Sequence, residues 1–381
     1  MGDWIKPANS RSEVRRAGEV LRRSKHAEGG HLSESDALNI LNNWKAAHEL
    51  PLDIVFRSVM GHLDFTCHDR TIVSRRKRTE SILLKLEQLP KLDLSRMQDL
   101  VGFRIVFRSD DPRQNIECVE KLTERIRNAK WEDTKPTRFA NYIDDARDSG
   151  YRSQHIIFKY DSKNNPEYKN MQVELQVRTK LQHIWATAVE TVGMFRRSHL
   201  KQGIGDEKWL EFFRVMSMLM QFDEDPYPDI HNDERGRLKL RLRDISHEIK
   251  ADRNLKVIAL QHAVLEKTFK KIEREMKGNI GYVLMTLDLG DIRIVDWGEK
   301  EAIGSSKVKL KAKIKLKSFP MDASEDATTE YGIEEKIASR DTSKYVLLAK
   351  GEDLNQLRDG FPNYFADIEE FIKIHSGYLE T

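Results

Sequence analysis

Hydrophobic residues recur along the first half of the chain at two spacings, one typical of helices and one of strands. Alternation of apolar and polar residues predicts strands around Phe103, over 151–160 and over 171–178. Apolar positions three and four residues apart predict five helices, over 13–25, 35–49, 75–89, 113–129 and 180–192. This succession of elements predicts an α/β (α+β) fold in which helices flank a mixed β-sheet.

The second half of the chain has a different pattern. The acidic, proline-bearing stretch 222–237 predicts a surface loop, and 238–276 predicts one long charged helix. Beyond Gly278, the segments YVLMTLDL, DIRIVDW, VKLKAKIKL and KYVLLAK predict strands, and 365–374 predicts a final helix. We therefore expect three units: N-terminal helices of 1–50 packing on the core, a core domain of 51–255, and a small C-terminal α+β domain of 270–381.

Composition restricts the class of protein. Lys and Arg total 65 against 62 Asp and Glu, a formal net charge of +3, so any polyanion site must be a local patch. Cys67 and Cys118 are the only cysteines, which excludes a disulfide framework and a four-thiolate zinc site. The sequence has no apolar stretch of about 18 residues and no apolar segment typical of a signal peptide. We expect a cytoplasmic protein without a membrane partner.

A group of cations lies in the segment SRRKRTESILLK. If residues 75–89 are helical, Lys77, Ser81 and Lys85 share one face, and Arg75 and Arg78 crowd its start. Such a row suits a nucleoside triphosphate, because Lys and Arg neutralise phosphate charge. A solvated basic helix is the alternative explanation.

Two carboxylates stand at positions suited to a metal ion. Asp99 precedes the strand in DLVGFRIVF, where Gly102 permits close approach of another backbone. Glu174 lies on one face of a later strand together with Gln176 and Arg178. Asp99 and Glu174 would together hold Mg²⁺, and Glu174 would take a proton from an attacking hydroxyl. A turn residue and an exposed sheet face are the alternatives.

The segment DSGYRSQHIIF places an aromatic ring at the end of a loop. Tyr151 follows Gly150, and His155 begins the next strand. A ring in this position can stack on a nucleobase, a contact worth ~1–3 kcal/mol, and burial in the core is the alternative. His183, one turn into the following helix, is expected to be a packing histidine with its hydrogen bonds satisfied.

Together and in this order, these segments resemble the synthetase domain of the RelA/SpoT family. The family pattern is R-x-K-x-x-x-S-x-x-x-K, D-x-x-G-x-R, G-Y-x-S-x-H and E-x-Q-x-R-T. The matching blocks are Arg75-Lys77-Ser81-Lys85, Asp99-Gly102-Arg104, Gly150-Tyr151-Ser153-His155 and Glu174-Gln176-Arg178-Thr179. The resemblance covers about residues 50–200 and implies a nucleotidyltransferase-like sheet.

The resemblance also implies a role for each matched residue. Arg75 and Arg104 would clasp the adenine of ATP. Its phosphates would be held by Lys77, Arg78, Ser81 and Lys85. Asp99 and Glu174 would ligate Mg²⁺, with Glu174 as the base. Tyr151 would stack on the acceptor base, and the acceptor would also meet His155, Gln176 and Arg178.

The C-terminal extension resembles that of the CapRel group, toxic synthetases fused to an antitoxin domain. This implies transfer of pyrophosphate from ATP to the 3′ end of tRNA, which blocks translation, and release when a phage protein such as the capsid protein binds the C-terminal domain. The group's Y-x-x-Y motif, which plugs the adenine site, is here Phe361-Pro362-Asn363-Tyr364. A (p)ppGpp synthetase acting on GTP or GDP is one alternative. A non-catalytic phage sensor is another, which two retained carboxylates argue against. No DNA partner is expected.

The most regular alternation in the chain is SKVKLKAKIKLK. As a strand it places six ammonium groups on one face: Lys307, Lys309, Lys311, Lys313, Lys315 and Lys317. Lysines of this kind protect an edge strand from aggregation. Alternatively, the strip meets tRNA phosphates or an acidic face of the trigger protein.

Overall fold

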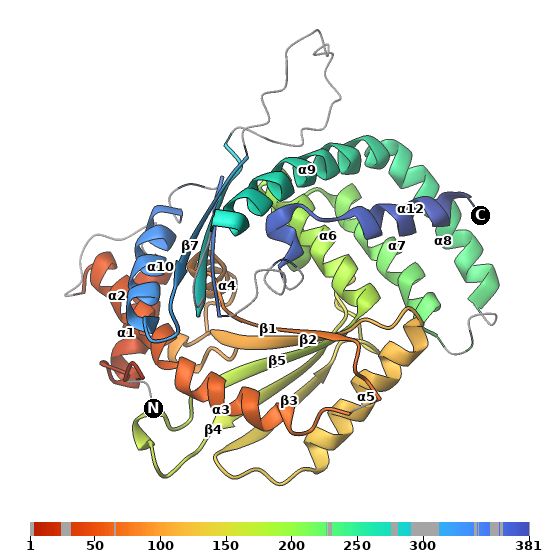
Figure 1. The fold of residues 1–381 in the computed structure, drawn as a ribbon. Coiled ribbons are helices and arrows are strands. Elements are labelled where there is room, and N and C mark those ends of the chain that lie inside the picture. Colours follow the sequence, from red (N-terminus) through yellow and green to blue (C-terminus); the bar gives the residue numbers. More distant parts are fainter. Residues whose placement is uncertain are drawn as a thin grey trace.

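The computed structural model describes residues 4–23, 32–64, 66–225, 227, 231–275, 281–290, 312–338, 341, 343–350, 358 and 361–380 of the 381-residue chain. A five-stranded sheet lies at its centre (Figure 1), in the order β1 (Arg70–Arg76), β2 (Val101–Phe107), β5 (Gln172–Thr179), β4 (Gln154–Tyr160) and β3 (Thr134–Asn141). Strands β2 and β5 pair parallel, and the other neighbours pair antiparallel. The predicted mixed sheet flanked by helices is confirmed.

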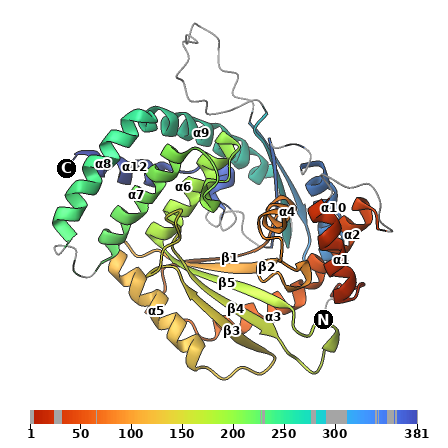
Figure 2. The same ribbon diagram turned by 180° about the vertical axis from the view of Figure 1, so that it is seen from behind.

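The two faces of this sheet differ in chemistry, as the alternation predicts. Helices α3 (Glu49–Met60) and α5 (Pro112–Asn128) cover one face. There the buried side chains of Phe103, Ile105 and Leu175 pack with those of the two helices. The opposite face carries the polar members of the same strands, and α4 (Thr79–Gln88) lies on that side (Figure 2).

Residues 75–89 do not form one helix, so the predicted helix is too long and Lys77 precedes it, while Ser81 and Lys85 keep the predicted helical spacing. Arg75 and Arg76 end β1, because the segment from Arg70 pairs along its whole length with β2. Helix α4 begins only at Thr79 and ends at Gln88. Together with α1 (Arg11–Arg23), α2 (Glu34–Ala47) and the short 3-10 helices Leu94–Arg96 and Pro166–Tyr168, α4 builds an N-terminal core.

The predicted loop over 222–237 and the single helix over 238–276 are also wrong. Helix α7 (Glu207–Glu224) runs into the expected loop, and α8 (Asn232–Glu248) starts within it. Lys250 adopts a left-handed φ of 51°, which separates α8 from α9 (Ala251–Glu275). Figure 1 shows α9 spanning the molecule from the C-terminal strands to α8, beside α6 (Lys180–Arg196). The 3-10 helix Leu200–Gln202 follows α6 and packs on it.

The C-terminal part contains a three-stranded antiparallel sheet in the order β7 (Lys313–Phe319), β6 (Tyr282–Asp288) and β8 (Lys344–Lys350). Strand β7 lies at its edge and keeps the predicted alternation, with Lys313, Lys315 and Lys317 exposed. DIRIVDW and Lys307, Lys309 and Lys311 lie outside the described residues. Helix α10 (Ser324–Ala338) was not predicted. The last helix, α12 (Glu369–Glu380), starts later than expected because Pro362–Phe365 form a 3-10 turn.

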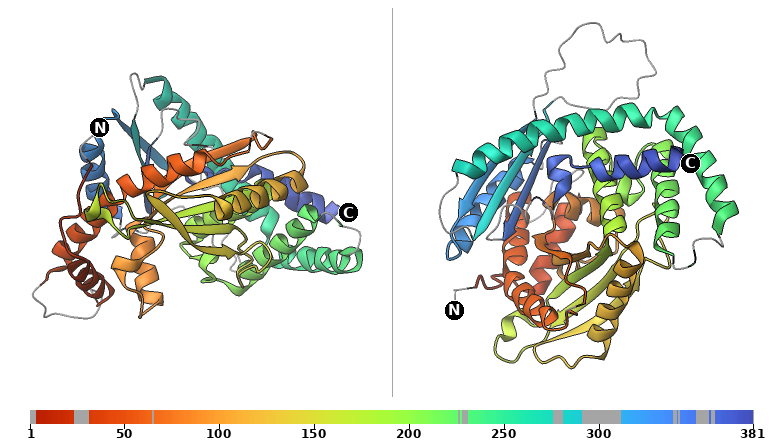
Figure 3. Two further views of the ribbon diagram at one scale, coloured as in Figure 1. Left: turned by 90° about the horizontal axis from the view of Figure 1, so that it is seen from below. Right: turned by 45° about the vertical axis from the view of Figure 1, so that its right-hand side comes forward.

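The C-terminal part packs closely on the rest of the chain. One continuous cluster of buried side chains joins α6 and α7 to β6, β8, the turn around Phe361 and α12. At the other end, Glu335 of α10 is buried against α2 and α4, where it accepts hydrogen bonds from Lys45 Nζ at 2.8 Å and Thr79 Oγ1 at 2.6 Å. The N- and C-terminal ends of the chain lie on opposite sides of the molecule (Figure 3). The proposed domain boundaries stay predictions.

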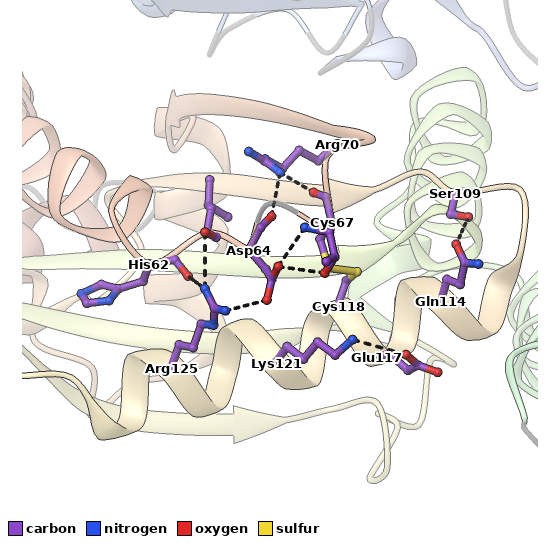
Figure 4. Close-up of a disulfide and its surroundings, with 12 residues drawn as sticks. His62, Asp64, Cys67, Arg70, Ser109, Gln114, Glu117, Cys118, Lys121 and Arg125 are labelled. Carbon is purple, nitrogen blue, oxygen red and sulfur yellow. Dashed lines mark hydrogen bonds and ion pairs between the residues drawn. A yellow bond between two sulfur atoms is a disulfide. The ribbon is translucent and has the colours of Figure 1, made fainter.

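Cys67 and Cys118 form a single disulfide, which sequence composition did not anticipate (Figure 4). It joins the segment before β1 to α5, across a separation of 51 residues. Next to it, Arg125 Nη2 donates to Asp64 Oδ2 at 2.6 Å and joins the same two segments. Within the described residues, no helix is both long and apolar enough to cross a membrane.

Candidate active site

A cavity of about 510 Å³ opens on the polar face of the large sheet, bounded by α4, the end of α6 and the C-terminal part. Its charge is strongly positive, because seven lining residues are cationic and three are anionic. The cations are Lys77, Arg78, Lys85, Arg104, Arg147, Arg197 and Lys201, and the anions are Asp99, Glu174 and Glu190. In a chain of net charge +3, this is the local basic patch that a polyanion requires.

Both predicted phosphate-binding lysines converge on Asp99. Lys77 Nζ lies 2.8 Å from Asp99 Oδ2, and Lys85 Nζ lies 2.8 Å from Asp99 Oδ1. Lys77 reaches this point from the turn between β1 and α4, where its backbone N–H donates to Leu100 O at 2.7 Å. Burial disfavours the charged carboxylate, but the two ammonium groups outweigh burial and hold the pKa of Asp99 well below its ordinary value.

Gly102 sets the distance between β2 and β5 beside Glu174. The two residues pair in register, and a Cβ built on Gly102 would lie 2.3 Å from the backbone oxygen of Glu174. A larger residue would therefore push β5 away, as the sequence interpretation of Gly102 predicts. The same pairing brings Glu174 close enough to Asp99 for the two charges to repel.

Five predicted residues form one closed ring of hydrogen bonds. His155 Nδ1 lies 2.9 Å from Glu174 Oε1, and His155 Nε2 lies 2.7 Å from the Tyr151 hydroxyl. Arg178 Nη2 donates to the Tyr151 oxygen at 2.8 Å and to Gln176 Oε1 at 2.7 Å. Gln176 Nε2 closes the ring by donating to Glu174 Oε2 at 2.7 Å. Each side chain in the ring fixes the orientation of its neighbours.

This ring shifts the titration of its members. Burial opposes the charge on both Glu174 and His155. At Glu174, the attraction of His155 outweighs burial and lowers the pKa, and at His155, Tyr151 and Glu174 outweigh burial and raise the pKa. Burial likewise opposes ionisation of Tyr151. Arg178, His155 and Lys201 outweigh it and lower its pKa well below the ordinary value. The site therefore holds Glu174 as a carboxylate.

Tyr151 lines the cavity but is only 4% exposed. Its ring packs near Trp185, with ring centroids 6.4 Å apart. Lys201 Nζ lies 5.0 Å from the ring centroid, and the Arg178 guanidinium lies 5.2 Å from it. The ring thus shares both predicted environments: it belongs to the core cluster and also borders the cavity.

The remaining predicted residues divide between those at the cavity and those away from it. Arg78, Ser81 and Arg104 line it, and so does Phe361. The side chain of Arg75 lies outside the described part of the structure, although its backbone pairs with Gly102. Tyr364 does not line the cavity. Its hydroxyl donates to Val346 O at 3.2 Å in the C-terminal core.

Several residues at the site were missed from sequence. Tyr345 of β8 lines the cavity, and the Arg78 guanidinium lies 5.5 Å from its ring centroid. Glu190 and the whole segment 197–202 also line it. His183 is buried as predicted, but neither of its ring nitrogens has a hydrogen-bond partner among the described residues, so the expected satisfied imidazole is wrong. Burial first, and then Arg104 and Arg178, lower its pKa well below the ordinary value.

Asp99 and Glu174 suit a magnesium ion whose other ligands come from the substrate. Asp99 and Glu174 face the same cavity and are both held ionised. Among the described residues no group of three or more His, Cys, Asp or Glu side chains is placed to hold a metal. Mg²⁺ commonly binds one or two carboxylates and takes its other ligands from phosphates and water, so these two residues fit it.

The family described as "Region found in RelA / SpoT proteins" matches residues 74–196. Residues 74–196 therefore form a RelA/SpoT-type domain. This RelA/SpoT-type domain contains every cavity residue from the four motif blocks and ends at the last residue of α6. Lys201, Tyr345 and Phe361 lie outside it.

Similar proteins include GTP pyrophosphokinase YjbM of Bacillus subtilis (strain 168), which is 30% identical over 118 residues, or 30% of this chain and 52% of the relative. The chain thus spans about half the length of the curated relative it matches. Among solved structures, small alarmone synthetase 1 of Bacillus subtilis bound to its product pppGpp is 20% identical over 49% of this chain and 94% of that one, with a TM-score of 0.38. The protein smu.1046c of Streptococcus mutans UA159 is 24% identical over 49% and 91%, with a TM-score of 0.34.

Proposed function

We propose that this chain is a Mg²⁺-dependent pyrophosphokinase that transfers the β,γ-pyrophosphoryl group of ATP to a hydroxyl of a nucleotide or RNA acceptor. The observation that carries the proposal is the convergence of Lys77 and Lys85 on Asp99 within a cavity of net positive charge. In phosphoryl-transfer sites lysines bind the phosphates and carboxylates bind the metal, and this convergence brings both kinds of group to one point.

The residues divide into a donor side and an acceptor side. On the donor side, Lys77, Arg78, Ser81 and Lys85 bind the ATP phosphates. Arg75 and Arg104 clasp the adenine. When bound, Mg²⁺ would be held by Asp99 and Glu174 and would neutralise charge on the transferred group. On the acceptor side, Tyr151 meets the nucleobase of the acceptor. His155, Gln176 and Arg178 bind the acceptor and, through the ring of hydrogen bonds, fix the orientation of Glu174, which accepts the proton.

The transfer makes one bond to phosphorus and breaks another. The acceptor oxygen forms a bond to the β-phosphorus of ATP, and the bond between that phosphorus and the oxygen bridging to the α-phosphorus breaks, which releases AMP. Glu174, ionised and paired with His155 at 2.9 Å, accepts the hydroxyl proton. The low pKa of Glu174 makes it a weak base, so positioning and charge neutralisation supply most of the catalysis.

For the acceptor we propose the 3′ end of tRNA, with inhibition of translation and phage defence as the outcome. This rests on the likeness of the C-terminal extension to the CapRel layout. GTP or GDP is the second candidate, favoured by the name of the similar enzyme, GTP pyrophosphokinase YjbM, and by the pppGpp bound to small alarmone synthetase 1. ATP labelled in the γ-phosphate, incubated separately with tRNA, GDP and GTP, distinguishes them. Label in tRNA supports the first, label in the guanine nucleotides supports the second, and label in neither contradicts the proposal.

We also propose that the C-terminal part restrains the enzyme until a phage protein binds it. Support comes from three contacts with the donor side. Tyr345 covers the Arg78 guanidinium, Phe361 lines the cavity, and Glu335 accepts a hydrogen bond from the first residue of α4. Tyr364 contributes by holding this segment on β8 rather than by filling the cavity.

A further inference from the structure

The segment that follows α6 forms one wall of the cavity, although no motif predicted it. Residues 197–202 all line the cavity. The segment folds tightly against α6, since Ser198 N–H donates to Gly193 O at 2.9 Å and a Cβ on Gly193 would lie 2.8 Å from Ser198 O. Leu200 is buried and anchors it in the core. The backbone therefore places Lys201 at a fixed point.

Lys201 extends from this wall over the ring of Tyr151. Its Nζ lies 5.0 Å from the ring centroid, within the range of a cation–π contact. Its side chain is only 16% exposed and forms an ion pair with Glu190 of α6. Burial first, and then the nearby Arg178 and Arg104, lower the pKa of Lys201 to about 8. The lysine therefore keeps most of its charge at neutral pH, in a place where two guanidinium groups already lie.

A third cation at this place is unfavourable unless an anion joins it. Arg178 is already engaged with Tyr151 and Gln176, and Glu190 supplies one carboxylate to Lys201. The ring that Lys201 covers is also the one proposed to receive the acceptor base. An acceptor base that stacks there must displace the ammonium, and the phosphate attached to that nucleoside arrives with it.

We propose that Lys201 is an acceptor-binding residue that covers the Tyr151 ring in the ligand-free enzyme and turns to a phosphate of the acceptor nucleotide when its base stacks on that ring. This proposal rests on the proposed function. The shared chemistry is a phosphate on the acceptor nucleotide, either the 5′ phosphates of a guanine nucleotide or the phosphodiester before the terminal nucleoside of an RNA. Lys201 then selects phosphorylated acceptors over free nucleosides.

The test compares Lys201→Met and Lys201→Arg in the full chain, with Lys208→Met as a matched control at an exposed lysine of α7. Steady-state transfer is measured at varied concentrations of ATP and of each acceptor. The acceptors are two matched pairs: GDP with guanosine, and a short CCA-ended RNA with adenosine. We expect Lys201→Met to raise the KM for the phosphorylated acceptor by about ten- to a hundred-fold, as loss of a charge-assisted hydrogen bond does, with the KM for ATP within about two-fold. Lys201→Arg restores most of this loss.

The preference for phosphorylated over free acceptor separates this role from a structural one. In Lys201→Met the ratio of transfer to the phosphorylated acceptor over transfer to the free nucleoside should fall towards one. If guanine nucleotides are the acceptors, the fall is seen with GDP and guanosine, and if tRNA is the acceptor, it is seen with the RNA and its nucleoside. A preference equal to that of the wild type, or equal rises in the KM of ATP and acceptor, overturns the role of Lys201. If the wild type transfers pyrophosphate to no acceptor, the proposed function fails. In that case calorimetry compares the affinities of wild type and Lys201→Met for GDP and for guanosine, which tests the phosphate contact without catalysis. Equal affinities of the two proteins for GDP overturn the contact.

Discussion

Replacement of Glu335 probes the joint between the C-terminal part and the donor side of the site. This carboxylate belongs to α10 and is buried where α10 meets α4. It accepts hydrogen bonds from Lys45 Nζ at 2.8 Å, Thr79 Oγ1 at 2.6 Å and the Tyr331 hydroxyl at 2.6 Å. The side chains of Lys45 and Glu335 are only 2% and 7% exposed. Removing one partner of such a pair leaves a buried charge uncompensated and costs about 3–5 kcal/mol. We expect Glu335→Ala to lose stability in this range.

Guanidinium-induced unfolding measures the loss, and hydrogen exchange over residues 79–88 locates it at the start of α4. Glu330→Gln is the matched control on the same helix, because its ion pair with Lys317 is 36% and 56% exposed and is worth about 1 kcal/mol or less. Lys45→Met combined with Glu335→Leu removes both buried charges and should cost less than the sum of the two single changes. A loss below about 1 kcal/mol for Glu335→Ala, with unchanged exchange in α4, would refute the buried joint.

Three further changes test the site and its restraint. Tyr151→Ala should raise the KM for the acceptor far more than that for ATP, because its ring meets the acceptor base; equal losses in kinetic assays with both substrates would assign the ring to the core alone. Tyr345→Ala should raise the transfer rate of the full chain and make its expression toxic, because it uncovers Arg78; an inactive but folded variant, checked by circular dichroism, would mean that the C-terminal part activates the enzyme. Changing Lys313 and Lys317 to Gln should lower the slope of log affinity against log salt for tRNA or the trigger by up to about 0.9 for each phosphate that these lysines neutralise, and an unchanged slope leaves them with edge protection only.

Point changes suit the question of restraint better than truncation. Helix α12 and the turn around Phe361 share one buried cluster with α6 and α7. Removing the C-terminal part would expose that apolar surface on the helices that hold Glu190 and the segment 197–202. A substitution at Tyr345 opens the cavity without uncovering the core.

The residues predicted best from sequence are those whose placement depends on strand alternation. Glu174, Gln176 and Arg178 share one face because successive side chains of a strand point to opposite sides, and the structure joins all three in the hydrogen-bonded ring. Gly102 was recognised for the same reason, since a Cβ there meets the neighbouring strand.

Other features could not be predicted because distant parts of the chain decide them. Residues 75–76 have helical neighbours in sequence, but pairing with β2 makes them the end of a strand. The break at Lys250 depends on a single left-handed residue within a continuous charged pattern. Tyr345 and Lys201 reach the cavity only through packing of β8 and of the segment after α6, and no local pattern marks either residue.

The most direct measurement of the central claim is the identity of the nucleotide released from ATP. ATP labelled in the adenine ring is incubated with the full chain and either tRNA or GDP, with Asp99→Asn as the control that removes the charge beside Lys77 and Lys85. The account predicts AMP, one molecule for each acceptor modified, with Asp99→Asn reducing it to background. Release of ADP, or acceptor-dependent AMP that survives Asp99→Asn unchanged, would contradict pyrophosphate transfer at this site.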